Sequence, residues 1–508
     1  MDPLISPPAK PSASPPRFRW DWLVPALGVL AFAWMVAAHM GAHAGGSDSS
    51  GYLNNARLLA QGRATLPMRL VPGLDPASVP AYTAVPLGFI PNEDHVTMTP
   101  TYPMGLPLLI AGAARLVGWT RAPGLVMALH ALAGLWLVFR MARDLGLTDW
   151  WAWLGVLVLA VSPIYLMMSV QLMSDVPALV WVTAAVWLAW SSGPRPWRAA
   201  AAGFALALAV LVRPTNLLAI IPVALALGWS PRRWLLLGLG GLPGAAFLGY
   251  FNLTAYGRLL TTGYGSVGWE FGRQYLPATF LNYSVWLPME LTPLCLLALG
   301  LPVLWRRQAK LSAVLASWAV PLPSFYLFYS HTHDAWWCLR FLLPAFPALI
   351  LAAILVGRAL LDRLTASQRS TWLAVAAVAV AAHGIAWSHH FRVLHASSGE
   401  RTYTESSLWI QSHLPANAVI ASMQTSGAMF YYTPFTFFRW DMIRPADFER
   451  IAQACAAAGR PVYAMLFPYE MDDPKWAAFA KHLPGRWVQI GAVREVSIWR
   501  YAGSPTSP

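Results

Sequence analysis

The feature that most constrains the fold is a series of long apolar segments separated by short, often basic, loops. Each segment approaches the roughly 20 residues that an α-helix needs to cross a bilayer. The pattern predicts a polytopic α-helical membrane protein with about eleven transmembrane helices and additional helices at the outer interface. The predicted segments are 20–42, 122–143, 150–171, 175–191, 198–213, 215–229, 233–252, 287–305, 311–329, 339–362 and 371–388.

The composition excludes an ordinary soluble enzyme. Of the 508 residues, 57% are hydrophobic and only 11% are charged, whereas soluble domains carry about 25% charged residues. The formal charge of +13 fits basic cytoplasmic loops and does not indicate a nucleic-acid partner. Three cysteines form neither a disulfide framework nor a metal motif.

The basic residues predict the orientation in a plasma (inner) membrane. With the N-terminus inside, the basic clusters all fall on the cytoplasmic side, as the positive-inside rule requires. A crossing by the Pro-interrupted piece 101–118 would invert most of them, so this piece is expected to be a helix at the outer interface. The clusters are Arg17 and Arg19; Arg140 and Arg143; Arg195 and Arg198; Arg232 and Arg233; Arg306, Arg307 and Lys310; and Arg358, Arg363 and Arg369.

Three regions follow from this topology. Residues 1–19 are rich in Pro and Ser and are predicted to be a disordered cytoplasmic N-terminus, followed by a first span retained as an anchor. Residues 20–388 form the transmembrane domain, with a long first outer loop at 43–121. Residues 389–508 are expected to be a small extracytoplasmic α/β domain. Its predicted helices are 401–413, 446–459 and 475–482, and its predicted strands are 418–422, 461–467 and 495–500.

Two isolated acids lie at the outer ends of predicted spans. Asp48 follows the first span in "GGSDSSGYLNNARLLAQG", and Asp175 ends the third in "QLMSDVPALVWV". Asp48 can be a solvated loop acid or part of a helix cap, with a serine nearby as the capping residue. Asp175, close to Pro177, can mark a helix N-terminus. A carboxylate beside apolar surface can also act as a general base, so the two acids form a candidate catalytic pair.

Cationic and aromatic residues collect on the same side. Arg213 lies where two short apolar segments meet, and it can snorkel to the interface or hold a phosphate. The stretch "YSHTHDAWWCLRFLLP" contains His331, His333, Trp336 and Arg340. It is consistent with an aromatic interface belt or with a phosphate or sugar subsite. A metal site is disfavoured because two histidines two residues apart do not share a helix face.

A further outer loop, 253–286, is rich in Gly, Tyr and Trp and contains Arg258. Such a loop can bind a sugar or a lipid head group, or it can lie at the interface without a ligand. Both interpretations remain open at this stage.

The order of these parts resembles the GT-C glycosyltransferases that use polyprenyl-phosphate sugars. It is most similar to the branch of protein O-mannosyltransferases and the lipid A aminoarabinose transferase. The resemblance is spread over roughly residues 20–360. The matching segments are "SDSSGYLNNARLLAQG", "TPTYPMGLPLLIAG", "QLMSDVPALV", "ALAVLVRPTNLLAIIP" and "CLRFLLPAFPALILAA".

The resemblance implies roles for particular residues. Asp48 takes the position of the catalytic base, and Asp175 that of a second acid in the outer cavity. Tyr102 lies in the segment similar to the family's interfacial helix and is expected to contact substrate. Two departures leave the contact to the donor phosphate open. Ser49 stands where the family often has Glu, and Tyr-Pro-Met-Gly at 102–105 replaces the Lys-Pro-Pro or His-Pro-Pro form.

The function expected from the sequence is inverting transfer of a sugar from a polyprenyl-phosphate donor to an acceptor hydroxyl. Asp48 is the expected base, and Arg213, Arg340 and Arg258 are candidate partners of the phosphate. The expected partners are the donor, membrane lipid and an acceptor glycan, lipid or protein. No cofactor is expected, and a divalent metal is the one left open. The alternatives are a transporter or flippase of lipid-linked sugars and a non-catalytic envelope-assembly protein.

Overall fold

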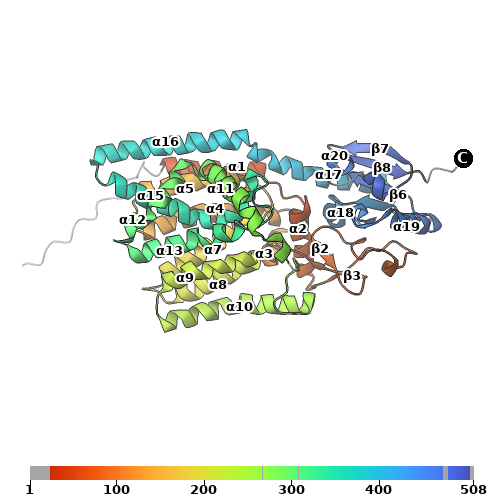
Figure 1. Ribbon diagram of the computed structural model, residues 1–508, viewed down its shortest axis with the longest axis horizontal. Helices are drawn as coiled ribbons and strands as arrows, with labels where there is room; N and C mark the ends of the chain where they lie inside the picture. Colours follow the sequence, from red (N-terminus) through yellow and green to blue (C-terminus); the bar gives the residue numbers. More distant parts are fainter. Residues whose placement is uncertain (1–22, 266, 307, 473–478, 504–508) are drawn as a thin grey trace, which may run out of the picture.

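The structure is a computed structural model that describes residues 23–265, 267–306, 308–472 and 479–503. The described part is elongated, with a large helical part at one end and a smaller domain of helices and strands at the other (Figure 1). The segment 1–19, predicted to be disordered, lies outside the described residues.

The helical part contains a helix, or a consecutive run of helices, at each of the eleven predicted apolar segments. These elements are α1 (Leu23–His39), α4 (Ala122–Asp144), α5 (Asp149–Ala160), α6 (Pro163–Ser169), α7 (Asp175–Trp190), α8 (Trp197–Val212), η3 (Pro214–Ala219), α9 (Ile220–Leu227), α10 (Pro231–Tyr256), α11 (Leu276–Leu291), η6 (Pro293–Gly300), α12 (Leu301–Trp305), α13 (Ala309–Ala319), α14 (Pro321–Tyr326), η7 (Trp336–Ala345), α15 (Phe346–Leu361) and α16 (Ala366–His390).

Length and hydropathy alone identify fewer crossings than the sequence analysis predicts. Four described helices are long and apolar enough to span a bilayer, and two bent helix pairs raise the number to six. Several shorter apolar helices accompany them, so the count of about eleven stays a prediction. The four are Ala122–Asp144, Pro231–Tyr256, Trp336–Leu361 and Ala366–His390; the bent pairs are Asp149–Ala160 with Pro163–Ser169 and Arg273–Leu291 with Pro293–Trp305.

A buried acid lies between the two bent pairs. The pair α5–α6 bends by 68° just before Pro163, and a proline cannot continue the hydrogen-bond pattern of the preceding helix. The Glu290 carboxylate, only 1% exposed, accepts a hydrogen bond at 2.7 Å from the free backbone N–H of Ile164 at this break. Glu290 was not predicted from the sequence, and its carboxylate closes the break between α5 and α6.

The packing separates a central helix from peripheral ones. After Asp175, α7 carries no charged residue, and it packs against α4, α8 and η7. A helix that is apolar all round is buried in protein. By contrast, α10 and α16 lie at opposite edges of the helical part (Figure 1) and are mostly exposed. Close packing of α10 on α8 requires glycine, because a Cβ at Gly203 would lie 1.9 Å from the Leu237 carbonyl oxygen.

The first outer loop is folded rather than extended. It contains α2 (Ser47–Ala60), β1 (Leu66–Pro67), η2 (Pro76–Ser78), β2 (Phe89–Pro91), β3 (Thr97–Pro100) and α3 (Gly105–Val117). The three short strands form an antiparallel sheet in the order β1-β3-β2. The helix expected within 101–118 is α3, whereas the small sheet was not predicted.

The C-terminal part is the small α/β domain that the sequence predicts. Its five-stranded sheet has the order β5-β4-β6-β8-β7, in which β5, β4 and β6 are parallel and β8 and β7 are antiparallel. The elements are η8 (Val393–His395), α17 (Ala396–His413), β4 (Val419–Ser422), α18 (Ser426–Tyr432), β5 (Thr436–Phe438), η9 (Trp440–Met442), α19 (Pro445–Ala457), β6 (Val462–Leu466), α20 (Pro468–Asp472), α21 (Phe479–His482), β7 (Trp487–Val493) and β8 (Val496–Tyr501).

The predicted elements of this domain are found with small shifts, and three others were missed. The predicted helix 475–482 falls partly outside the described residues, and its described end is α21. The strands β5 and β7 and the short helix α18 were not predicted. Only three residues form β5, which is too short for a recognisable alternation.

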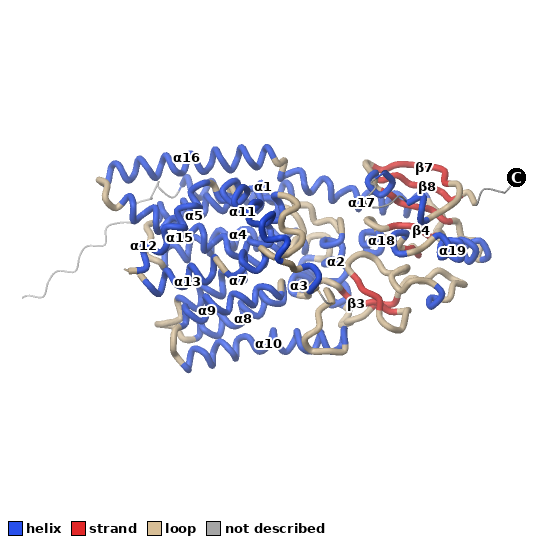
Figure 2. Tube along the Cα trace, in the orientation of Figure 1, coloured by secondary structure: helices blue, strands red, loops and turns tan. Residues whose placement is uncertain are grey.

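The first outer loop and the C-terminal domain share a core. Val71 lies in the hydrophobic cluster formed by β4, β6 and α19, and the Arg439 backbone N–H donates to the Thr83 carbonyl at 2.7 Å. The Arg69 guanidinium donates to the Phe430 and Thr433 carbonyls at the end of α18 and lies 4.1 Å from the Phe430 ring centroid. The loop strands and the C-terminal strands therefore lie close together (Figure 2).

Arg69→Ala is expected to loosen this junction. The substitution removes hydrogen bonds from a charged donor to carbonyl oxygens that close α18, a loss of about 2–3 kcal/mol in the free energy of unfolding. Thermal unfolding and limited proteolysis of the purified protein in detergent measure the effect. Arg63→Ala, an exposed arginine of the same loop, is the matched control and should unfold like the wild type. Equal stability of the two variants would contradict the shared core.

Candidate functional site

Asp48 is the second residue of α2, directly after the chain leaves α1. The residue before the helix is Gly46, and no described side chain caps α2; the Ser50 hydroxyl instead donates to the Gly46 carbonyl. The expectation that a serine caps this helix is therefore wrong. A carboxylate in the first turn is stabilised by the helix dipole. Upstream, the Gly41 N–H donates to the Val170 carbonyl at 2.8 Å, which ties this turn to the end of α6.

The Asp48 carboxylate forms an ion pair with Arg340 from η7. The Arg340 Nη2 to Asp48 Oδ2 distance is 3.1 Å, and both side chains are partly open to solvent, with 22% and 24% of their surface exposed. The other Nη of Arg340 lies 3.6 Å from the Met173 sulfur. The acid after the first apolar segment and the arginine of the tenth thus meet directly.

Asp175 forms a second ion pair that is more deeply buried. Its Oδ1 lies 2.7 Å from Arg213 Nη2, and its side chain has no exposed surface. The Arg213 Nε donates to the Ser174 hydroxyl at 3.0 Å, and that hydroxyl also accepts from the Tyr52 phenol at 2.9 Å. Tyr52 belongs to α2, so this network joins the start of α7 to the helix that carries Asp48.

One aromatic ring lies beside both pairs. The guanidinium carbons of Arg213 and Arg340 lie 5.3 Å and 5.2 Å from the centroid of the Phe341 ring. Both distances are within the range of a cation–π contact. The structure thereby brings together Asp48, Asp175 and the two arginines that the sequence analysis singled out separately.

Three tyrosine rings border the cluster formed by the two ion pairs, Asp48–Arg340 and Asp175–Arg213. The Tyr102 ring lies 5.2 Å from that of Tyr52 and 6.2 Å from that of Tyr264, and the Tyr102 and Ser47 hydroxyls are hydrogen-bonded. Tyr264 comes from the outer loop after α10. The loop approaches so closely that a Cβ at Gly263 would lie 2.3 Å from the Pro100 carbonyl oxygen. Tyr52 and Tyr264 were not identified as site residues from the sequence.

The histidines predicted for the site lie at its rim. His331 Nε2 is 3.5 Å from Glu270 and its Nδ1 is 3.3 Å from Asp334, with 58% of the side chain exposed. His333 stacks on Tyr275 with ring centroids 5.7 Å apart. The described residues contain no group of three or more His, Cys, Asp or Glu side chains arranged to hold a metal ion.

Trp336 and Arg258 are not joined to the cluster by any described hydrogen bond or ion pair. The Trp336 ring stacks on Phe391 at 4.1 Å with an interplanar angle of 12°. One face of Trp336 is therefore covered by the protein itself and cannot stack on a sugar. Arg258 is exposed just after α10.

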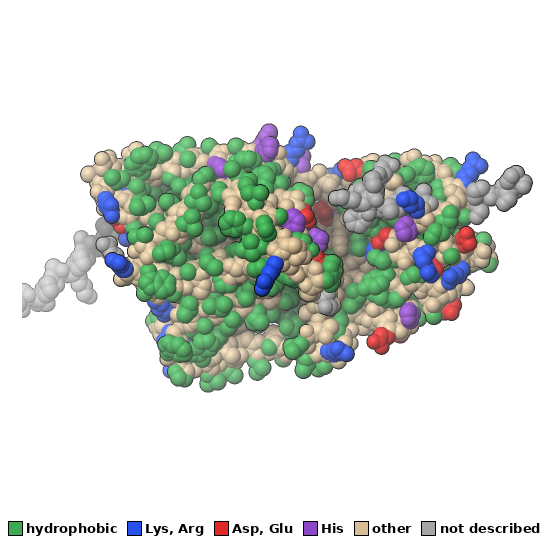
Figure 3. Space-filling model, viewed as in Figure 1, with side chains coloured by type: hydrophobic (Ala, Val, Ile, Leu, Met, Phe, Trp, Pro, Cys, Tyr) green, Lys and Arg blue, Asp and Glu red, His purple; other side chains and the backbone are tan. Residues whose placement is uncertain are grey.

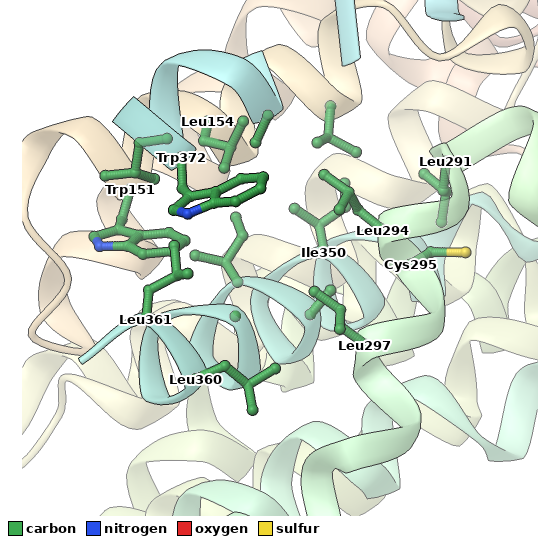
Figure 4. Close-up of a pocket in the computed structure, with 16 residues that line it drawn as sticks. Trp151, Leu154, Leu291, Leu294, Cys295, Leu297, Ile350, Leu360, Leu361 and Trp372 are labelled. Carbon is green, nitrogen blue, oxygen red and sulfur yellow. The ribbon is translucent and has the colours of Figure 1, made fainter. Parts of the chain in front are cut away.

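The contacts of α2 with η7, α18 and the start of α7 place the two ion pairs at the boundary between the two parts of the molecule. On the face shown in Figure 3, acidic and histidine side chains gather at this boundary. Two apolar clefts lie elsewhere, on either side of α16. One has a volume of about 200 Å³ and is lined by side chains such as Trp151, Ile350 and Trp372 (Figure 4). The other, of about 1330 Å³, lies between α16, α1 and α5. Neither contains the two ion pairs.

Comparison with known proteins shows which proteins this chain is similar to. Residues 101–249 match the family model described as dolichyl-phosphate-mannose-protein mannosyltransferase. ArnT from Cupriavidus metallidurans bound to undecaprenyl phosphate is similar over 96% of this chain and 99% of its own, with 14% identity and a TM-score of 0.56. No curated protein sequence matches the chain.

Two further solved structures share the fold. The oligosaccharyltransferase from Archaeoglobus fulgidus is similar over 92% of this chain and 72% of its own, with 11% identity and a TM-score of 0.52. The arabinofuranosyltransferase AftD from Mycobacteria is similar over 96% of this chain and 40% of its own, with 15% identity and a TM-score of 0.53. The fold is that of the GT-C enzymes, multi-pass membrane glycosyltransferases. This likeness is one of fold, and residues 101–249 also match a glycosyltransferase family model.

The two ion pairs are expected to differ in their effect on stability. Asp175→Asn leaves the buried Arg213 charge unpaired and should lower the free energy of unfolding by about 3–5 kcal/mol. Asp48→Asn affects a partly solvated pair and should cost about 1 kcal/mol or less. Thermal unfolding of both variants in the same detergent measures the difference. Equal destabilisation by the two substitutions would show that the pairs are not buried to different degrees.

Proposed function

We propose that the protein is an inverting glycosyltransferase that moves a sugar from a polyprenyl-phosphate donor to an acceptor hydroxyl at the outer face of the plasma membrane. Asp48 is the general base, and Arg340 and Arg213 bind the donor phosphate. The similarity to ArnT, solved with undecaprenyl phosphate, supports a lipid-phosphate donor. An archaeal oligosaccharyltransferase of the same fold is described in complex with a dolichol-phosphate.

The observation that carries the proposal is the adjacency of the two carboxylate–arginine pairs. An arginine partly open to solvent, such as Arg340, can exchange a carboxylate for a phosphate, because guanidinium groups bind both in the same fork-like geometry. Arg213 is held by the buried Asp175 and the Ser174 hydroxyl, so it stays fixed. Donor binding would therefore draw Arg340 from Asp48 and leave that carboxylate free to accept a proton.

The proposed reaction is a single displacement. The acceptor oxygen attacks the anomeric carbon of the sugar, its proton passes to Asp48, and the bond between the sugar and the phosphate oxygen breaks. The electron pair of that bond leaves with the polyprenyl phosphate, whose negative charge the arginines stabilise. Attack from the side opposite the leaving group inverts the anomeric centre. Asp48 and the arginines supply the proton transfer and the charge stabilisation, so these steps need no cofactor.

The proposal also includes the orientation of the protein in the membrane. On the face shown in Figure 3, several Lys and Arg side chains lie at the end of the helical part remote from the C-terminal domain, and others lie on the C-terminal domain itself. The positive-inside rule favours placing that end in the cytoplasm. The ion-pair cluster and the C-terminal domain then lie outside, in the periplasm or its equivalent, where a donor anchored by its chain in the outer leaflet can reach Asp48.

A transporter of lipid-linked sugars has two observations in its favour. Bent helix pairs and a buried intramembrane acid, here Glu290, are typical of transporters. However, Glu290 is engaged by the Ile164 N–H at a helix break, which is a structural use of the carboxylate. A purely structural envelope-assembly protein has no need for two ion pairs on one ring. Sugar transfer therefore remains the function that the geometry supports best.

Asp48→Asn is expected to lower turnover by about 10²–10⁴-fold, because the substitution removes the base and leaves the fold intact. The assay uses the full-length protein in membranes with a panel of polyprenyl-phosphate sugars and measures transfer to cell-envelope acceptors. Glu93→Gln, which changes an exposed acid of the same outer loop, is the control and should act like the wild type. Undiminished turnover by Asp48→Asn would refute its role as the base.

The exchange of Arg340 between carboxylate and phosphate can be tested by binding. Arg340→Ala should weaken binding of undecaprenyl phosphate, whereas Asp48→Asn should strengthen it by about two- to five-fold, because Arg340 then has no competing carboxylate. Ligand-induced thermal stabilisation measures both effects without turnover. Weaker binding by Asp48→Asn would mean that the carboxylate does not compete with the phosphate for Arg340.

A further inference from the structure

A second carboxyl group reaches the Asp48 turn from the C-terminal domain. Glu400 lies in the second turn of α17, the helix that leads from the membrane part into that domain. Its carboxyl group lies directly on the backbone of Gly45, where a Cβ would come within 1.7 Å of Glu400 Oε2. Gly45 in turn accepts the Ser50 N–H in the first turn of α2. The two helices therefore meet at the residues that carry Asp48.

The Glu400 carboxyl group has few hydrogen-bond partners around it. Its Oε2 atom is buried and has no hydrogen-bond partner among the described residues. Burial raises the pKa of Glu400 to about 7; the Ser49 hydroxyl opposes this shift, and the nearby Asp48 charge adds to it. An acid with this pKa changes its charge at the pH at which most enzymes work.

The charged and titratable groups around Glu400 are few. Asp48 faces it from α2, and Tyr403 lies one turn further along its own helix. Among the other charged groups near α17, Arg494 pairs with Glu405, His43 binds the Thr404 hydroxyl, and Arg401 is exposed. The environment of Glu400 therefore contains one anionic neighbour, Asp48, and no described cation paired with it.

We infer that Glu400 is a positioning residue of the transfer site, through which the C-terminal domain sets the conformation of the turn that carries Asp48. The inference rests on the proposed function for its catalytic consequence. Contact of Glu400 with Gly45 fixes the turn from which Asp48 projects. Ionisation of Glu400 places a second negative charge near Asp48, so the two carboxyl groups are electrostatically coupled.

The inference gives the C-terminal domain a defined role. The Arg57 guanidinium stacks on Tyr431 at 3.5 Å, and Asn54 donates to the Gly427 carbonyl at 3.0 Å, so α18 also holds α2. Contacts from α17 and α18 together hold α2, the helix that carries the proposed base Asp48, in place. Displacement of the domain would remove Glu400 and loosen Asp48 at the same time.

The first test uses stability and needs no substrate. The pKa of Glu400 is raised on folding, so its ionisation costs stability as pH rises from about 4.5 to 7 and the cost is fully present above 7. Glu400→Gln should therefore raise the Tm by about 2–5 °C at pH 8.5 and change it little at pH 5. In an Asp48→Asn background the gain at pH 8.5 should be smaller, because the neighbouring charge is gone.

Glu470 provides a matched control. It is a second buried acid of the C-terminal domain, with a pKa also raised to about 7 by burial, but its partners are the backbone N–H groups of Phe467 and Gln424 and the Trp440 indole. The effect of Glu470→Gln should be the same in the wild-type and Asp48→Asn backgrounds. An equal gain from Glu400→Gln in both backgrounds would overturn the coupling.

The second test is the pH dependence of sugar transfer by the full-length protein. We expect wild-type kcat to rise about two- to five-fold as pH increases through 7, because the negative charge of ionised Glu400 near Asp48 favours transfer of the acceptor proton. Glu400→Gln should lose this rise and Glu400→Asp should partly restore it, while Glu405→Gln on the same helix should keep it. A rise that persists in Glu400→Gln overturns the inference. Wild-type protein without activity on any donor overturns the proposed function instead, and the stability tests then decide the coupling alone.

Discussion

The site depends on two carboxylate–arginine pairs whose guanidinium groups both lie beside the Phe341 ring. Each partner comes from a different part of the chain: Asp48 from α2, Asp175 from α7, Arg213 from the break after α8, and Arg340 from η7. Charges in such an apolar helical part are costly unless they are paired. Pairing therefore fixes how these four segments meet and creates a polar site at the same place.

The unequal burial of the two pairs gives them different roles. The Asp175 side chain is completely buried and keeps Arg213 in place, whereas the Asp48 and Arg340 side chains remain partly exposed to solvent. A rigid cation next to an exchangeable one suits a substrate whose phosphate must bind, react and leave. The C-terminal domain borders the same place, since α17 and α18 contact the helix that carries Asp48. This domain is therefore part of the site's framework as well as a neighbour of the membrane part.

The sequence predicts the helices well because each apolar segment has a length and composition set by the membrane. It also identifies Asp48, Asp175, Arg213 and Arg340, since isolated charges at the ends of apolar segments stand out in a charge-poor chain. Their pairing could not be predicted, because Asp48 and Arg340 are joined only by tertiary packing. Glu400 was missed for a related reason: its segment "ASSGERTYTESS" is polar and looks like a solvated helix, and only the contact with Gly45 makes its carboxyl group buried.

The most direct measurement is an experimental structure of the protein with a polyprenyl phosphate bound, compared with the ligand-free state. The account predicts that the phosphate contacts Arg340 and Arg213, that the Arg340–Asp48 distance grows beyond hydrogen-bond range, and that the Asp175–Arg213 pair stays intact. A phosphate bound elsewhere, with Asp48 and Arg340 still paired, would contradict it.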